Sequence, residues 1–150
     1  MKAPRDKQVT ISVNLYLAND GSNGYLTFAS PLQIQCVFSL AETFHTITFR
    51  LDGNAKELSF CGPNGSAHAG LQWTDNAPAC IEFGPLPNDK KSIVLHNRHT
   101  EASRQNNNPR ATRGLWHYRL FAKTANNVVY STPLTTSNGG ANSNPSIKNV

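Results

Sequence analysis

The pair Asn144-Pro145 is the place in this sequence where bond-breaking chemistry can be argued from residue types. The side-chain amide nitrogen of Asn144 can attack its own backbone carbonyl, which forms a succinimide and expels the proline nitrogen. Proline favours this route because it leaves as a secondary amine and has no N–H of its own. An amide is a weak nucleophile, so the bond must also be strained, its carbonyl oxygen must be stabilised and Pro145 must receive a proton. Asn144 and Pro145 are therefore the candidate catalytic residues of a self-cleaving bond.

The alternative is that this pair has no function and occurs because the chain is rich in asparagine. Asn108-Pro109 is a second such pair inside a polar loop, so it provides an internal comparison.

A basic segment, residues 98–113, is the candidate contact surface. Residues 98–150 hold seven Lys and Arg against Glu101 alone, whereas residues 1–97 hold seven against eight acids. Such a local excess attracts phosphates or anionic polysaccharide, although a solvated loop has the same composition. Nucleic acid is disfavoured as the partner because aromatic residues do not recur through the segment. The candidate binding residues are Arg98, Arg104, Arg110 and Arg113.

The three cysteines, Cys36, Cys61 and Cys80, are predicted to be reduced thiols, because they are odd in number and no export signal is recognised. Cys36 lies in an alternating apolar run and is expected to be an inert core residue. The spacings between the later cysteines and His68, His96 and His99 match no paired zinc pattern. We therefore expect neither a metal nor a cofactor.

The elements that must position these residues are predicted to be β-strands. Residues 9–17 alternate apolar and polar side chains, which is typical of a half-buried strand. Turn formers at residues 19–24 lead to further strands at 25–28 and 32–38. Residues 43–51 form another strand with Ile47, Phe49 and Leu51 on one face, and Asp52-Gly53-Asn54 predicts a hairpin toward Leu58 and Phe60.

Short apolar pieces at 71–73 and 80–83 lie between glycines and prolines and are expected to be edges or loops, and 92–96 is a further strand. Residues 114–123 have two alternating faces, of which Trp116, Tyr118, Leu120 and Ala122 form the core face. Residues 128–132 should pair with them as a last hairpin. About seven to nine short strands without a helix predict an all-β, antiparallel immunoglobulin-like β-sandwich.

The length of 150 residues suits one domain, predicted over residues 1–133. Residues 134–150 are predicted to be a flexible Asn/Gly/Ser-rich tail. If this tail docks, Ile147 and Val150 should form a final strand on the edge of the sandwich.

The heptad at residues 144–150 resembles the end of the DP-EP family, small bacterial β-sandwich proteins named for an Asp-Pro and a Glu-Pro near the C-terminus. Looser similarity extends through residues 47–51, the strand with Trp116 and Tyr118, and residues 128–133. Two departures stand out. Asn144 occupies the position of the family's Asp, and Val150 stands where Glu-Pro would begin. The resemblance implies a fold more than an activity.

Together these patterns predict a binding or structural module, monomeric or weakly self-associating, that meets an unknown protein or anionic ligand through residues 98–113. The alternative is a self-processing domain that cleaves Asn144-Pro145. Lectin-like recognition through Trp73 ranks lower, because a Trp in a proline-bounded loop more often packs. The longest apolar run, Leu15–Ala18, has four residues, and residues 1–13 lack the apolar region of a signal peptide, so we expect no membrane span and a cytoplasmic location.

Overall fold

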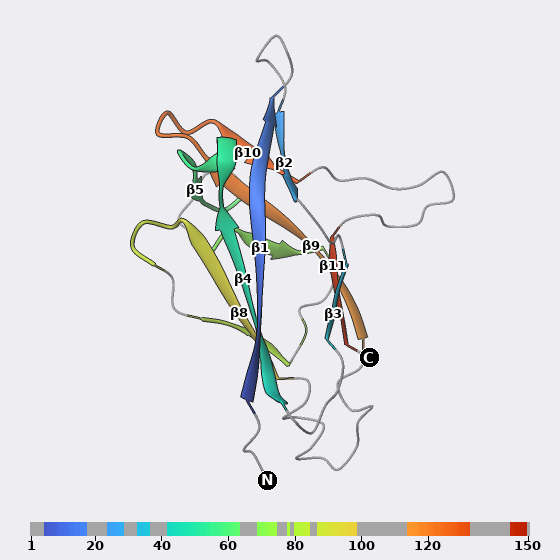
Figure 1. Ribbon diagram of the computed structural model, residues 1–150. Helices are drawn as coiled ribbons and strands as arrows, with labels where there is room; N and C mark the ends of the chain where they lie inside the picture. The colour runs from blue at the N-terminus through green and yellow to red at the C-terminus, as the bar shows by residue number, and fades with distance from the viewer. Residues whose placement is uncertain are drawn as a thin grey trace, which may run out of the picture.

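The computed structural model places two β-sheets face to face, and the all-β prediction is confirmed (Figure 1). One sheet has five strands and the other has six; a single 3-10 turn is the only helical element among the described residues. The described residues are 5–17, 24–28, 33–36, 42–63, 69–74, 78, 80–84, 87–98, 114–132 and 145–149.

The five-stranded sheet has the order β2-β1-β4-β8-β7. Its centre is the parallel pair of β1 and β4, whose register aligns Val9 with Ile47 and Val13 with Leu51. Its edge strands are β2 and β7, which pair antiparallel with β1 and β8. The strands are β1 (Arg5–Leu17), β2 (Gly24–Phe28), β4 (Glu42–Leu51), β7 (Ile81–Phe83) and β8 (Ser92–Asn97).

The six-stranded sheet is built around β9, which crosses behind the five-stranded sheet in Figure 1. Its main path runs β10-β9-β11-β3, and β5 and β6 also pair with β9. The strands are β3 (Gln33–Cys36), β5 (Ser59–Phe60), β6 (Leu71–Trp73), β9 (Gly114–Lys123), β10 (Val129–Ser131) and β11 (Ser146–Asn149).

Four short strands complete the two edges of β9. Alternate residues of a strand direct their N–H and C=O groups to opposite edges. On one edge, the Tyr118 N–H donates to the Pro145 carbonyl over 2.9 Å, next to β11. On the other edge, the Phe121 N–H donates to the Gly70 carbonyl and the Phe121 carbonyl accepts from the Cys61 N–H. Segments far apart in sequence are thereby held on one strand.

The core lies between the sheets. Ile47, Phe49 and Leu51 are buried on one face of β4, as their alternation predicts, and the Phe49 ring meets Tyr118 edge-on with centroids 5.3 Å apart. Tyr118, Leu120 and Ala122 are buried from the β9 side, whereas Trp116 is only partly buried. Phe121, predicted on the outer face, is also buried, and the Arg119 guanidinium lies over its ring, 5.0 Å from the centroid. The last hairpin, β9 with β10, is confirmed.

The predicted hairpin between β4 and the Leu58–Phe60 region is wrong. β4 pairs with β1 and β8, and the chain turns through the 3-10 element η1 (Gly53–Ala55) into β5 of the other sheet. Ala55 and Leu58 are buried. Their burial draws the chain inward, so it crosses between sheets rather than folding back.

Two further expectations are corrected. The sheets are mixed rather than wholly antiparallel, because β1 runs parallel to β4 and β11 parallel to β3. The described residues form eleven strands rather than seven to nine. The extra strands are short pieces such as β5, β6 and β7, which become strands only because a long neighbour supplies their hydrogen bonds.

The C-terminal strand does not lie on an edge as expected. β11 is inserted between β9 and β3, with Ile147 opposite Trp116 on one side and Ile34 on the other. Ile147 has no exposed surface. Residues 134–144 and Val150 lie outside the described residues.

We expect Ile147→Ala to lower the free energy of unfolding by about 2–5 kcal/mol, because it removes a fully buried side chain from between two strands. Urea unfolding followed by circular dichroism measures this loss. Lys148→Ala is the matched control on the same strand, since Lys148 is half-buried, and should change stability by no more than about 0.5 kcal/mol. Equal losses in both variants would contradict the burial of this strand.

Candidate functional site

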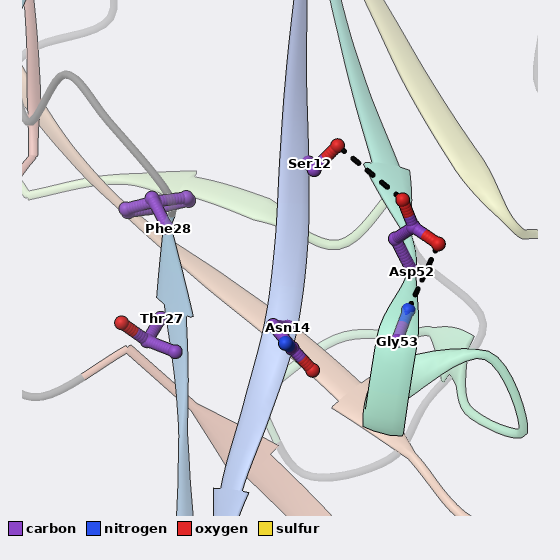
Figure 2. A pocket seen from close by; sticks show the side chains of 6 residues that line it. All are labelled: Ser12, Asn14, Thr27, Phe28, Asp52 and Gly53. Atoms are coloured by element: carbon purple, nitrogen blue, oxygen red, sulfur yellow. Dashed lines mark hydrogen bonds between the residues drawn. The ribbon is translucent and has the colours of Figure 1, made fainter.

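A hollow of about 290 Å³ lies over β1, between β2 and the end of β4 (Figure 2). Its lining offers hydroxyls, an amide and a carboxylate beside one aromatic ring. The lining residues are Ser12, Asn14, Thr27, Phe28, Asp52 and Gly53. Its size is near the lower limit for sites that hold a small molecule or a single unit of a polymer.

Three strands bring these side chains together. The period of two along β1 turns Ser12 and Asn14 away from the buried residues Ile11 and Val13. Antiparallel pairing sets Thr27 of β2 opposite Asn14. Parallel pairing brings the end of β4 alongside, where the Asp52 N–H donates to the Val13 carbonyl over 2.9 Å.

The amide of Asn14 is fixed by backbone donors. Its Oδ1 accepts from the N–H groups of Leu15 and Asn54, each over 2.8 Å. In return, Asn54 Nδ2 donates to the Leu15 carbonyl. These two contacts show which end of the Asn14 amide is the oxygen, because backbone N–H groups need an acceptor. The other end, Nδ2, is therefore a hydrogen-bond donor. No contact within the described part of the chain uses this donor.

Gly53 is required at this corner. Its φ is +54°, a conformation that L side chains rarely adopt. A Cβ atom here would also lie 2.8 Å from both Nδ2 and Oδ1 of Asn14. Glycine therefore allows the Asn14 amide to sit directly against the turn.

Asp52 caps the 3-10 turn and still presents one carboxylate oxygen to the hollow. Its Oδ1 accepts from the Gly53 N–H over 2.9 Å. Among the described residues, its Oδ2 has only a long contact of 3.5 Å from the Ser12 hydroxyl, as drawn in Figure 2. A carboxylate accepts several hydrogen bonds, so Oδ2 keeps capacity for a ligand. The lining can bind by hydrogen bonds, and the described residues that form it include no histidine, lysine or cysteine that could act with Ser12 as a base or nucleophile.

A pair of exposed tyrosines continues the same row. Tyr16 and Tyr25 face each other across β1 and β2, one step along from the Asn14 and Thr27 pair. Their ring centroids are 5.0 Å apart with the planes tilted by 32°. They are 52% and 40% exposed, which is unusual for two neighbouring rings and leaves much of each open to solvent.

Of the predicted binding residues, the structure describes Arg98, which does not line this hollow. Arg98 follows β8, is exposed, and its guanidinium lies 3.8 Å from the Glu82 carboxylate. Its backbone N–H donates to the Cys80 carbonyl over 2.8 Å. Arg104, Arg110 and Arg113 lie outside the described residues.

A buried amide pair lies at the root of the basic segment. Asn97, directly before Arg98, donates from Nδ2 to Asn149 Oδ1 over 2.6 Å. Asn149 lies opposite Gly114, where the chain enters β9, and its Nδ2 donates to Cys80 Sγ over 3.3 Å. The side chain of Asn149 thus contacts β8, the strand before residues 98–113. Its backbone pairs with β9, the strand after them.

Of the predicted cleavage pair, Pro145 is described and Asn144 is not. Pro145 is buried, and its carbonyl accepts from the Tyr118 N–H. The residue after the candidate bond is therefore fixed to the core strand β9.

All three cysteines are buried. Burial raises the pKa of Cys61, a shift that Lys123 and Lys90 oppose, and burial also raises the pKa of Cys80, opposed by the hydrogen bond from Asn149. Neutral thiols of this kind react slowly. Among the described residues, no three His, Cys, Asp or Glu side chains are grouped so that they could hold a metal ion.

Trp73, the residue considered for lectin-like stacking, is half-buried and meets Tyr118 edge-on at 6.1 Å. It packs against the core. Tyr16 and Tyr25 instead form an exposed aromatic pair. The alternation of residues 9–17 put Tyr16 on the polar face of a strand, but it did not indicate that its ring meets Tyr25.

No known family model and no curated protein matches this chain. Within the residues that the structure describes, no helix has the length and apolar character needed to cross a membrane.

Sequence reasoning missed the hollow and the amide pair at the root of the basic segment. Alternation along residues 9–17 already placed Ser12 and Asn14 on the polar face. The missing information was the parallel pairing of β1 with β4, which sets Asp52 beside them. The sequence does contain an indication of the amide pair. Asn97 and Asn149 are both polar residues at inward positions of alternating strands.

We expect Asn14→Ala to lower the free energy of unfolding by about 1–2 kcal/mol, because the N–H groups of Leu15 and Asn54 lose their acceptor. Thermal or urea unfolding measures the change. Asn126→Ala is the matched control, since Asn126 lies exposed in the turn after β9. A loss no larger than that of the control would show that the amide does not hold this corner together.

Proposed function

We propose that this chain is a binding module, a β-sandwich that presents the basic segment 98–113 to an anionic partner. The observation that supports it most is the anchoring of both ends of that segment. Asn97 and Gly114 are each in a strand, and Asn149 contacts or pairs with both. Loops that bind ligands are commonly carried in this way on a rigid scaffold.

The positive charge of the basic segment indicates the chemical class of its partner. Its arginines carry most of the excess positive charge of the chain, whose net charge is +5. The Arg98 guanidinium forms an ion pair with the Glu82 carboxylate at the surface, where ion pairs are weak because solvent and salt screen them. Arg98 can therefore still bind an anionic partner. The partner is an acidic protein surface or an anionic polymer, with nucleic acid the less favoured of the polymers, and the module is monomeric or weakly self-associating.

An immunoglobulin-like arrangement and the resemblance to DP-EP proteins belong to the same proposal. Two facing sheets, the hairpin of β9 and β10, and a strand after that hairpin support it. The parallel pairs β1–β4 and β11–β3 depart from a purely antiparallel sandwich.

We expect the protein to bind heparin, used as a polyanionic probe, with an affinity that falls steeply with salt. The triple variant Arg104→Ala, Arg110→Ala, Arg113→Ala should reduce the slope of log affinity against log salt by about three, one for each lost cation. Fluorescence titration at a series of NaCl concentrations measures the slope.

Arg50→Ala is the control for that titration, because Arg50 is an exposed arginine on β4. It should leave the slope unchanged. A flat salt dependence in the parent protein, or equal slopes in the parent and the triple variant, would contradict contact through the segment. A single-stranded oligonucleotide titrated in parallel distinguishes nucleic acid from a sulfated polysaccharide.

The second candidate function is self-cleavage of the Asn144-Pro145 bond. The observation that favours it is the fixed position of Pro145, which is buried and hydrogen-bonded through its carbonyl to β9. Holding one side of the bond restricts its motion, and restricted geometry is what a weak amide nucleophile requires. Residues 146–149 would remain paired with β9 and β3 after cleavage.

If the bond is cleaved, prolonged incubation will produce a species that lacks residues 145–150 in denaturing mass spectrometry. The denaturant is essential, because the released peptide would stay bound as a strand of the native sheet. Asn144→Ala should abolish this product, and Asn108→Ala should not. An unchanged intact mass eliminates this function.

A further inference from the structure

We propose that the outer face of the five-stranded sheet, at β1 and β2, is a binding site for an uncharged saccharide. The site joins two features that lie in one row: the tyrosine pair of Tyr16 and Tyr25, and the hollow beside Asn14 and Thr27. The residues of this row share a face because they recur with a period of two on paired strands.

The two features are the right distance apart to meet one ligand. Two residues along a strand advance it by about 6.6–6.8 Å, so the Asn14 and Thr27 pair lies one such step from the tyrosine pair. A ligand longer than a single ring would therefore cover the tyrosines with one unit and enter the hollow with the next.

The tyrosine rings supply an apolar platform. They are 52% and 40% exposed and tilted by only 32° to one another, so together they form a broad surface rather than a core contact. A pyranose ring has an apolar face of C–H groups and a rim of hydroxyls. Its C–H face suits an aromatic platform, which Tyr provides while keeping its hydroxyl in water.

The hollow supplies hydrogen bonds for the hydroxyl rim. Asn14 is held so that Nδ2 is its remaining donor, and Asp52 Oδ2 has only a long contact with Ser12. The hydroxyls of Ser12 and Thr27 both donate and accept. Donors and acceptors set side by side match a sugar, whose hydroxyls also do both.

The charge around the hollow favours an uncharged ligand. Among the described residues that line the hollow, Asp52 supplies the one carboxylate, and none carries a positive charge. Arg50 lies beside Ser12 on β4, so the two opposite charges near the hollow balance. An anionic ligand would meet Asp52, whereas Arg98, the described arginine of the basic segment, lies at the far end of β8.

The test is affinity electrophoresis in native gels that contain a neutral soluble polysaccharide, with hydroxyethyl cellulose, β-glucan, xylan and galactomannan as the probes. At least one probe should retard the protein, and titration calorimetry with an oligosaccharide of that probe then gives Kd. Tyr16→Ala and Tyr25→Ala should each weaken binding by about tenfold, the size of one lost aromatic contact.

Phe83→Ala is the matched control. Phe83 is an aromatic residue of similar exposure, 43%, on the opposite edge strand of the same sheet. The Phe83→Ala variant should bind the oligosaccharide with the same Kd as the parent protein. Circular dichroism and the unfolding midpoint verify that the tyrosine variants, altered at exposed positions, are folded.

Two results would overturn this site. The first is that none of the four probes retards the protein. The second is that Tyr16→Ala and Tyr25→Ala bind the oligosaccharide with the same Kd as Phe83→Ala. The site is independent of the basic segment, because the tyrosine variants should bind heparin as the parent does. The triple arginine variant, whose affinity for heparin should depend less on salt, should still be retarded by the neutral polysaccharide.

Discussion

The backbone of β9 must find hydrogen-bond partners along both of its edges, and the six-stranded sheet follows from this requirement. A buried N–H or C=O group without a partner costs about 1–3 kcal/mol, and residues 120–122 of β9 are buried. β10 and β11 supply partners on one edge, and β5 and β6 on the other. Strands of two to four residues are stable here because each joins a long strand that is already packed against Phe49 and the rest of the core.

The parallel pair of β1 and β4 has an equivalent role in the other sheet. It aligns the ends of two strands whose polar residues are about 40 positions apart, so that Asn14 and Ser12 meet Asp52 and Gly53. The left-handed conformation of Gly53 then lets the chain leave the sheet under the Asn14 amide. The same corner that directs the chain from one sheet to the other also creates the hollow.

Asn149 links the two regions that carried the functional predictions. It sits on the strand that follows Asn144-Pro145, and it holds Asn97 and Cys80 at the start of the basic segment. Removing one partner of such a buried hydrogen-bonded pair lowers the free energy of unfolding by more than the complete pair adds to it. The position of β11 and the position of Asn97, directly before the basic segment, are therefore coupled, since both depend on the same buried amide.

The sequence by itself determined the strands with long alternation and the faces they bury. Ile47, Phe49 and Leu51 on β4, and Tyr118 and Leu120 on β9, follow from the period of two, because a strand that covers a core must turn alternate side chains inward. Only the tertiary structure decided which strands are neighbours. The parallel pairings, the crossover at Gly53, the insertion of β11 and the meeting of Tyr16 with Tyr25 all join residues through contacts distant in sequence. Local alternation is identical for every possible partner, so these pairings are set by which arrangement satisfies all the buried backbone groups at once.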